Sequence, residues 1–371
     1  MRALVRDYRS GVHRGGAIIA THLPSFDRVD PARRLRPAMN RLAAAPAFGL
    51  LIAAALAAFA IALSVGSVAL DLTAVARALL GGADATPTMI VRDLRLPRAI
   101  AAFATGGSLA LAGALLQVLL RNPLADPYVL GVSGGAAVGA LLTILVGAAA
   151  WMTPLGAFGG AFASTVMVFA LSRGDGAWSP TRLLLTGVIV AAGWAALVAL
   201  LLTLAPDAQL RGMLFWLIGD LSSPPIAWIA LAMLVLGLSV ALPFARDLNA
   251  LARGNFAAAA LGVAVTRLPW LLFGLSAALT AVAVTTAGAI GFVGLIVPHA
   301  VRLLLGSDQR VILPACALAG GALLLIADTL SREVAAPTQL PVGVITALLG
   351  GPFFLVVLHR RRAGSLRAVW P

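Results

Sequence analysis

Several residue types that soluble proteins use freely are scarce or absent in this 371-residue chain. It has no lysine, one glutamate (Glu333) and one cysteine (Cys316), and only 11% of its residues are charged. Soluble domains carry roughly 25% charged residues. A chain with so little charge lacks the polar surface of a soluble protein, and its 61% hydrophobic content indicates a membrane protein.

Each absence also excludes a class of function. A Walker A loop, GxxxxGK[ST], needs a lysine to hold nucleotide phosphates, so this sequence carries no such loop. A single glutamate excludes a paired-glutamate acid–base site. The four histidines show no metal-ligand spacing such as HExxH, and Cys316 alone cannot form an intrachain disulfide. We therefore expect no catalytic site, no cofactor and no resident metal.

Long apolar runs recur along most of the chain. A helix needs about 20 residues to cross ~30 Å of hydrocarbon, and about ten runs have this length. The sequence predicts an all-α polytopic membrane protein with about ten transmembrane helices, at about residues 46–66, 99–120, 128–148, 155–171, 183–204, 226–244, 269–288, 290–306, 311–330 and 341–358.

The arginines indicate the orientation. With the N-terminus in the cytoplasm, 21 of the 27 arginines lie in cytoplasmic segments and six lie outside, as the positive-inside rule favours. Topology therefore accounts for the net charge of +13, and we expect membrane lipid rather than nucleic acid as a partner. Residues 1–45 are expected to form a basic cytoplasmic tail, 46–362 the transmembrane domain and 363–371 a cytoplasmic tail.

Three arginines at outer helix ends are candidates for contact with another protein. In Arg95-Leu96-Pro97-Arg98, a proline in the first helical turn would leave the two arginines three residues apart and on one side. With Arg332, they are expected to be exposed guanidiniums that pair with carboxylates of a docking protein. The alternative is that they reach lipid headgroups.

Two further segments stand out between the spans. Residues 245–268 combine small residues with scattered polar groups, which favours two short surface helices that a cytoplasmic partner would contact. Residues 121–127 form a proline-rich turn in which Asp126 can cap a helix that begins at Pro127. The turn residues singled out are Asn122, Pro123, Asp126 and Pro127.

Ionisable groups at or within the spans are a functional hypothesis by default. Those present are Asp126, His299, Arg302 and Asp328. The favoured alternative is that they lie near helix ends and are capped or paired. No buried acidic relay of a proton-coupled carrier is evident in the sequence.

Two sequence signatures resemble a known family. The first runs from RLPRAIAAFATGGSLALAGALLQ (95–117) into RNPLADPYVLGVSGGA (121–136). The second joins GAIGFVGLIVPHAVR (288–302), LPACALAGGALLLIADTLSR (313–332) and QLPVGVITALLGGPFF (339–354). The chain closely resembles FecCD-type permeases, the membrane subunits of ATP-driven importers for iron–siderophores, haem and cobalamin.

The resemblance implies a type II ABC importer permease fold in the bacterial inner membrane. It also implies a homodimer with two ATP-binding cassette ATPase subunits below it and a periplasmic binding protein above it. In such permeases the outer arginines, here Arg95, Arg98 and Arg332, meet glutamates of the binding protein. Surface helices between the sixth and seventh spans contact the ATPase; the matching residues are Leu248, Asn249, Ala250, Leu251, Ala252, Gly254, Ala257, Leu261 and Gly262.

The sequence thus predicts a permease subunit that moves an iron–siderophore, or alternatively haem or cobalamin, from the periplasm to the cytoplasm. An ion-coupled secondary transporter is the alternative. It would work without an ATPase and would need at least one essential buried carboxylate.

Overall fold

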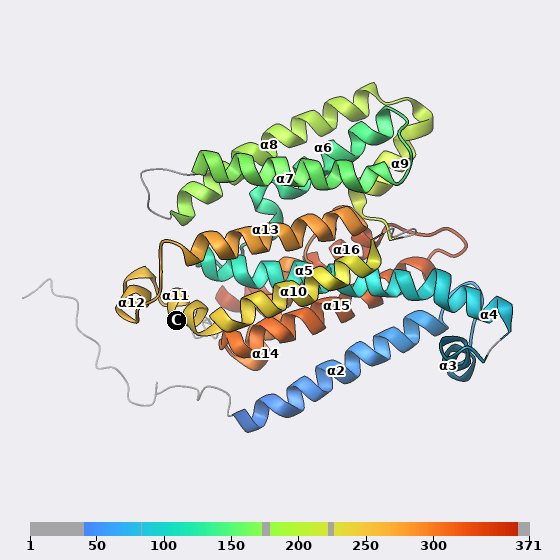
Figure 1. Ribbon diagram of the computed structural model, residues 1–371, viewed down its shortest axis with the longest axis horizontal. Helices are drawn as coiled ribbons and strands as arrows, with labels where there is room; N and C mark the ends of the chain where they lie inside the picture. The colour runs from blue at the N-terminus through green and yellow to red at the C-terminus, as the bar shows by residue number, and fades with distance from the viewer. Residues whose placement is uncertain (1–40, 83, 173–178, 222–225, 363–371) are drawn as a thin grey trace, which may run out of the picture. The chain divides into compact units, whose positions relative to one another are not determined.

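The computed structural model describes residues 41–82, 84–172, 179–221 and 226–362. All regular elements in these ranges are helices (Figure 1), which confirms the all-α fold class. The described residues belong to one unit, Met39–Pro371. Residues 1–40 and 363–371 of the expected tails lie outside the described residues, and helix α2 (Arg41–Ser64) begins five residues inside the segment expected to be tail.

Seven helices in the described ranges are long and apolar enough to cross a membrane, and three shorter apolar helices accompany them. Together they coincide with the ten spans expected from the sequence. The long ones are α2, the continuous helix Ala85–Leu119, α7 (Met152–Ser172), α8 (Pro180–Leu204), the continuous helix Ala227–Ala252, α13 (Leu268–Ala287) and α15 (Gln309–Glu333). The shorter ones are α6 (Val132–Leu145), α14 (Val293–Leu305) and the apolar part of α16 (Val342–Arg362).

Short elements cap the two ends of the bundle. The helix Ala85–Leu119 consists of α4 (Ala85–Met89), a π-helical stretch η2 (Ile90–Arg95) and α5 (Leu96–Leu119), and Ala227–Ala252 consists of α10 (Ala227–Ala241), η4 (Leu242–Phe244) and α11 (Ala245–Ala252). The others are α3 (Leu72–Leu80), η3 (Pro127–Leu130), α9 (Asp207–Ile218) and α12 (Asn255–Ala260). Figure 1 places α3, α4 and α9 at one end, hereafter the α3 end, and α11 and α12 at the other, the α12 end.

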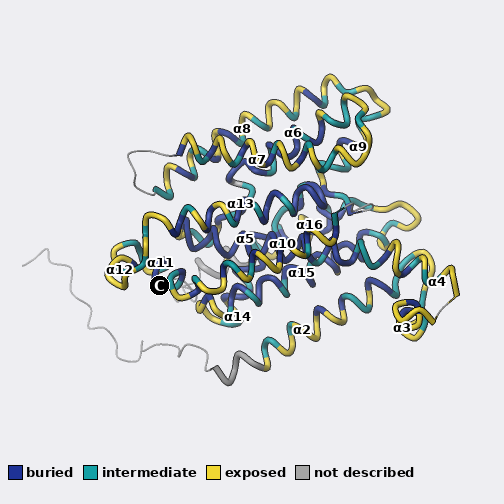
Figure 2. Tube along the Cα trace, viewed as in Figure 1, coloured by how far each residue is buried: buried dark blue, intermediate teal, exposed yellow. Residues whose placement is uncertain are grey.

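Helix α5 is the centre of the bundle. Nearly every residue from Ala99 to Leu119 is buried, and helices α15, α13, α10 and α14 pack against it. Figure 2 shows this central region as buried, whereas α2 and α8 carry long exposed stretches. Exposed side chains there are apolar, such as Leu50 (72% exposed) and Ile189 (71% exposed), as expected for helices surrounded by lipid or by another membrane subunit.

Glycines set the close packing of α5. A Cβ at Gly113 would lie only 1.9 Å from Gly294 O of α14, and one at Gly106 would lie 2.2 Å from Gly320 O of α15. Small residues allow membrane helices to approach backbone to backbone. The glycine-rich signatures of the sequence therefore serve helix packing in this subunit.

The contact at Gly113 gives a direct prediction about stability. Gly113→Ala is expected to destabilise the subunit by about 1–3 kcal/mol, because α5 and α14 must move apart to admit the methyl group. Gly274→Ala on α13 is the matched control, since an added Cβ there meets nothing within 4 Å. Unfolding of the purified subunit in detergent measures both; equal midpoints for the two variants would contradict the packing assignment.

Candidate functional site

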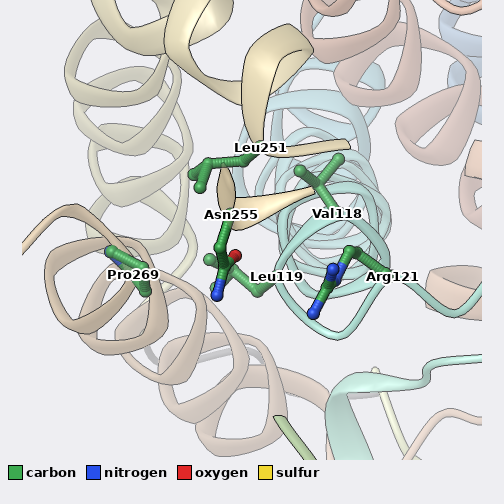
Figure 3. A pocket seen from close by; sticks show the side chains of 6 residues that line it. All are labelled: Val118, Leu119, Arg121, Leu251, Asn255 and Pro269. Atoms are coloured by element: carbon green, nitrogen blue, oxygen red, sulfur yellow. The ribbon is translucent and has the colours of Figure 1, made fainter. Parts of the chain in front are cut away.

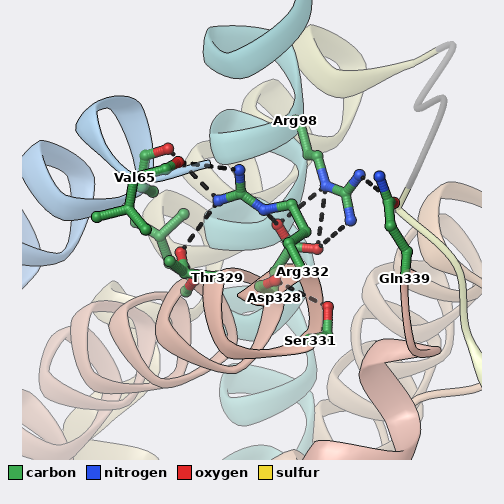
Figure 4. Close-up of polar contacts among 9 residues, drawn as sticks. Val65, Arg98, Asp328, Thr329, Ser331, Arg332 and Gln339 are labelled. Atoms are coloured by element: carbon green, nitrogen blue, oxygen red, sulfur yellow. Dashed lines mark hydrogen bonds and ion pairs between the residues drawn. The ribbon is translucent and has the colours of Figure 1, made fainter. Parts of the chain in front are cut away.

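At the α3 end, two of the three predicted docking arginines, Arg98 and Arg332, bind one carboxylate, Asp328 (Figure 4). Asp328 of α15 is 1% exposed. Its Oδ1 accepts a hydrogen bond from Arg98 Nη2 at 2.9 Å and its Oδ2 accepts one from Arg98 Nε at 3.0 Å. Arg98 Nη1 also donates to Gln339 Oε1 at 3.1 Å. Two parallel bonds of this kind are the strongest geometry of an arginine–carboxylate pair, so Arg98 and Asp328 join α5 firmly to α15.

Arg95 is directed toward the C-terminal end of α2. Its guanidinium donates to the carbonyl oxygens of Leu63 (2.6 Å), Ser64 (3.0 Å) and Val68. Carbonyls at a helix C-terminus lack partners within the helix, and the positive charge also suits the negative end of the helix dipole. Gly66 leaves space for the group, because a Cβ there would lie 2.8 Å from Arg95 Nη2. Arg95 therefore caps α2.

Arg332 has longer and weaker contacts than the other two arginines. Its Nε lies 3.5 Å from Asp328 Oδ2. Its terminal nitrogens donate to Val65 O and Ala62 O, both at 3.4 Å, and to Thr329 Oγ1 at 3.3 Å. These distances are near the upper limit of a hydrogen bond, so the contacts leave Arg332 the least firmly held member of the cluster.

The sequence predicted exposed arginines, and on this point the prediction is wrong. Arg95 is 8% exposed, and the side chains of Arg98 and Arg332 are each 12% exposed. Arg95 is buried and the other two are partly buried because helices α2, α5 and α15 converge at this end, a tertiary contact that the spacing within one motif does not contain. We refer to Arg95, Arg98, Arg332 and Asp328 as the arginine cluster; docking by its arginines stays a prediction.

At the α12 end, residues 245–268 form the two short helices α11 and α12. Of the nine residues matched to ATPase contact, three are buried and six are partly buried or exposed. Leu248, Ala250 and Leu251 are buried, so they hold α11 against the bundle and offer no surface to a partner. The others are partly buried or exposed: Asn249, Ala252, Gly254, Ala257, Leu261 and Gly262.

The most exposed large side chain of this helix pair was missed from the sequence. Phe256 of α12 is 91% exposed, and Leu261, directly after the end of α12, is 68% exposed. An aromatic residue in an otherwise small and polar connection is the signal that could have identified it, because exposed aromatics are typical of protein interfaces.

Asn249 connects α11 to the start of α15. Its Nδ2 donates to Asp308 Oδ1 at 2.8 Å, and its Oδ1 accepts a bond from Gln309 N at 2.9 Å. Asp308 also caps α15, since its Oδ1 accepts a bond from Arg310 N at 3.0 Å. The amide of Asn249 thus donates one hydrogen bond to Asp308 and accepts one from Gln309 at the first turn of α15.

A small hollow lies beside α11 where α5, α12 and α13 meet (Figure 3). Its volume is about 10 Å³, room for about one water molecule. Its lining residues are Val118, Leu119, Arg121, Leu251, Asn255 and Pro269. Ligand pockets are usually about 300–1,000 Å³, so this hollow is a packing gap beneath the helix pair rather than a cargo site.

Comparison with known proteins decides the family. The model of the FecCD transport family matches residues 52–360, which is most of the chain. The chain belongs to the FecCD transport family. The ten apolar helices of its described ranges are therefore those of a multi-pass membrane permease, as the two sequence signatures indicated.

Named relatives of this FecCD chain differ in what they transport. It is 43% identical to the cobalamin import system permease protein BtuC of Halobacterium salinarum over 77% of each chain. It is 42% identical to the hemin transport system permease protein HmuU of Yersinia pestis, over 73% of this chain and 83% of that one. The Fe(3+) dicitrate transport system permease protein FecD of Escherichia coli is 39% identical, over 74% and 86% of the two chains.

A solved structure agrees with the fold. It is described as an inward-facing conformation of an ABC transporter of metal-chelate type, and it matches with a TM-score of 0.75 and 29% identity. The match covers 85% of this chain and 99% of that one. The FecCD fold thus extends over nearly all of the described helices.

The proline-rich turn of this FecCD chain has the geometry expected from its sequence. Asn122 Oδ1 accepts a bond from Leu124 N at 2.9 Å, and Asp126 Oδ1 accepts one from Tyr128 N at 2.8 Å, at the start of η3. Burial raises the pKa of the Asp126 carboxyl, and the bond from Tyr128 N opposes that rise. The turn holds α5 and α6 in a fixed relation, which is a structural role.

Arg302 and His299 lie inside the FecCD bundle on α14, where they are 3% and 2% exposed. Arg302 Nη1 donates to Gln117 Oε1 of α5, and Gln117 Nε2 donates to Leu295 O of α14 at 3.2 Å. Buried polar groups in a bundle need such partners. Arg302 therefore joins α14 to α5 through a neutral amide, a pairing that the sequence alone did not indicate.

Proposed function

We propose that this chain is the membrane-spanning subunit of an ATP-driven importer in the bacterial inner membrane. The observation that carries the proposal is the set of relatives 39–43% identical over about three quarters of the chain, which are named as permeases for cobalamin, hemin and Fe(3+) dicitrate. These cargoes share one chemistry, a metal ion held in an organic chelate. The subunit moves a cargo of this class from the periplasm to the cytoplasm, an iron–siderophore being the favoured example.

In this proposal ATP hydrolysis belongs to a separate subunit. The chain has no lysine and hence no Walker A loop. The helix pair α11 and α12 offers Phe256 and Leu261 as exposed apolar contacts at the α12 end, and the arginine bias favours a cytoplasmic location for this end. Two ATPase subunits would each contact one such helix pair of a permease homodimer, whose subunits would meet through exposed apolar helix faces.

A periplasmic binding protein docks at the α3 end in the same proposal. Arg98 and Arg332 share one buried carboxylate, Asp328, and Arg95 interacts electrostatically with Arg332 and Glu333, so three guanidiniums face two carboxylates. The cluster therefore keeps an excess of positive charge that favours an acidic partner surface. The weakly held Arg332 is the member best able to exchange its internal contacts for a carboxylate of the binding protein.

The rival function, an ion-coupled carrier, would use a buried carboxylate that changes its charge during transport. Asp328 is such a carboxylate by burial, but both of its oxygens are already bound by arginine. Its geometry favours a fixed structural charge, and this observation favours the ATP-driven importer.

Uptake assays test both the function and the cargo. A strain lacking its own chelate importers, supplied with this permease and its ATPase and binding protein, is offered an iron–siderophore, haem and cobalamin in separate assays. We expect ATP-dependent accumulation of one cargo class and little of the other two. Accumulation of none of the three would contradict the proposed cargo class.

A further inference from the structure

Helix α15 carries a polar contact at each of its ends. At its first turn, Asp308 and Gln309 bind Asn249 of α11. Twenty residues along, Asp328 binds Arg98 and Arg332. Between Asp308 and Asp328 the helix rises roughly 30 Å at 1.5 Å per residue, which is about the thickness of the hydrocarbon core. One continuous helix thus connects the two candidate partner surfaces.

The middle of α15 packs closely against α5. A Cβ at Gly320 would lie 2.4 Å from Gly106 O, and a Cβ at Gly321 would lie 2.4 Å from the ring of Phe103. Close-packed interiors transmit displacement rather than absorb it. A shift imposed at the first turn of α15 is therefore expected to reach its other end.

We propose that Asn249 is the positioning residue that fastens the helix pair α11–α12 to α15, so that displacement of the pair by the ATPase also displaces the arginine cluster through Asp328. The proposal rests on the proposed function, and it deepens that function by naming the connection between the two partner surfaces. It also gives Asn249 a role that its buried neighbours Leu248 and Ala250 do not have, since they only pack.

The chemistry of the contact provides a specific test. Asn249→Asp replaces the donating amide with a second carboxylate 2.8 Å from the Asp308 oxygen, and the two negative charges repel. Adding Asp308→Asn removes one of the two negative charges and with it the repulsion. The carboxylate at position 249 can still accept a bond from Gln309 N. Asp308 Oδ1 is the atom that both accepts from Asn249 Nδ2 and caps Arg310 N, so the amide oxygen at position 308 can keep the cap, but the original bond to position 249 is not restored.

The experiment uses the complete complex with its ATPase and its loaded binding protein, reconstituted in nanodiscs. The readout is the ratio of ATP hydrolysis with the binding protein to basal hydrolysis without it. For Asn249→Asp we expect that ratio to fall by roughly threefold to tenfold, the factor that corresponds to one net hydrogen bond. The double variant Asn249→Asp/Asp308→Asn is expected to recover part of the lost ratio, because the repulsion is removed although the original bond is not restored.

Asn122→Asp is the matched control. It makes the same amide-to-carboxylate change in the turn after α5, where Asn122 Oδ1 accepts a bond from Leu124 N that a carboxylate can also accept. This variant is expected to keep the wild-type ratio. If Asn249→Asp alone fails to assemble, recovery of assembly and of part of the ratio in the double variant supports the proposal.

Three results would overturn the role of Asn249: an unchanged ratio in Asn249→Asp, a double variant that assembles with a ratio no higher than that of Asn249→Asp, or an equal loss in Asn122→Asp. Failure of the proposed function has a different signature. In that case the wild-type complex itself shows no stimulation of ATP hydrolysis by the loaded binding protein, and the role of Asn249 falls with it.

Discussion

Asp328→Asn is expected to destabilise the subunit by about 3–5 kcal/mol, because it leaves Arg98 and Arg332 buried without their shared carboxylate. The new amide can still accept one bond, but its Nδ2 would face a guanidinium donor. Since Asp328 joins α15 to α5, the loss is expected to loosen the α3 end and to lower binding-protein-dependent transport with it. Thermal unfolding of the purified subunit, alongside its uptake activity, measures both effects.

Two further variants show whether the buried charge causes this loss. Asp207→Asn changes an exposed carboxylate on α9 at the same end and is expected to shift stability by less than about 0.5 kcal/mol. The double variant Asp328→Asn/Arg98→Gln removes a charge from each side and is expected to regain part of the lost stability. A melting point for Asp328→Asn equal to that of wild type would show that the cluster does not hold these helices together.

Arg332→Gln is expected to weaken binding of the loaded binding protein by about tenfold or more, the usual worth of a charge-assisted hydrogen bond. Its stability is expected to change little, because the internal bonds of Arg332 are 3.3–3.4 Å long. Arg95 and Arg98 are poorer test positions, since their short bonds hold α2 and α15 in place. The affinity of the detergent-solubilised complex for the binding protein is the measurement.

Arg211→Gln is the control for general electrostatic attraction. Arg211 lies at the same end on α9, is exposed and does not belong to the arginine cluster. Its Cζ lies 5.7 Å from the ring centroid of Phe215. We expect a much smaller loss of affinity for this variant. Equal losses for Arg211→Gln and Arg332→Gln would indicate long-range charge alone and would contradict a specific docking contact.

The sequence was sufficient for the fold because a membrane span has a strong local signature. Length and apolarity identified all ten helices, including α14, whose 13 residues follow α13 after only a short connection. The expected orientation in the membrane likewise needed only local information, the number of arginines in each connecting segment. The start of α2 at Arg41 was missed because the residues before the apolar run carry no span signal, although they continue the same helix.

The site was harder to predict because its contacts join residues far apart in the sequence. The motif spacing placed Arg95 and Arg98 at one helix start, but only the packing of α2 and α15 beside α5 shows that both guanidiniums are internal. Asp328 was noted as an ionisable group in a span, without its partners. Asn249 was one of nine matched residues, and nothing in its own segment distinguishes it from Ala250, because its partner Asp308 lies 59 residues away.

Transport by purified components in proteoliposomes tests the central claim most directly. We expect cargo to accumulate against its gradient only when the permease is joined by its ATPase, ATP and the loaded binding protein, and to stop when ATP is replaced by a non-hydrolysable analogue. Accumulation by the permease alone, driven by an ion gradient and without nucleotide, would contradict the account.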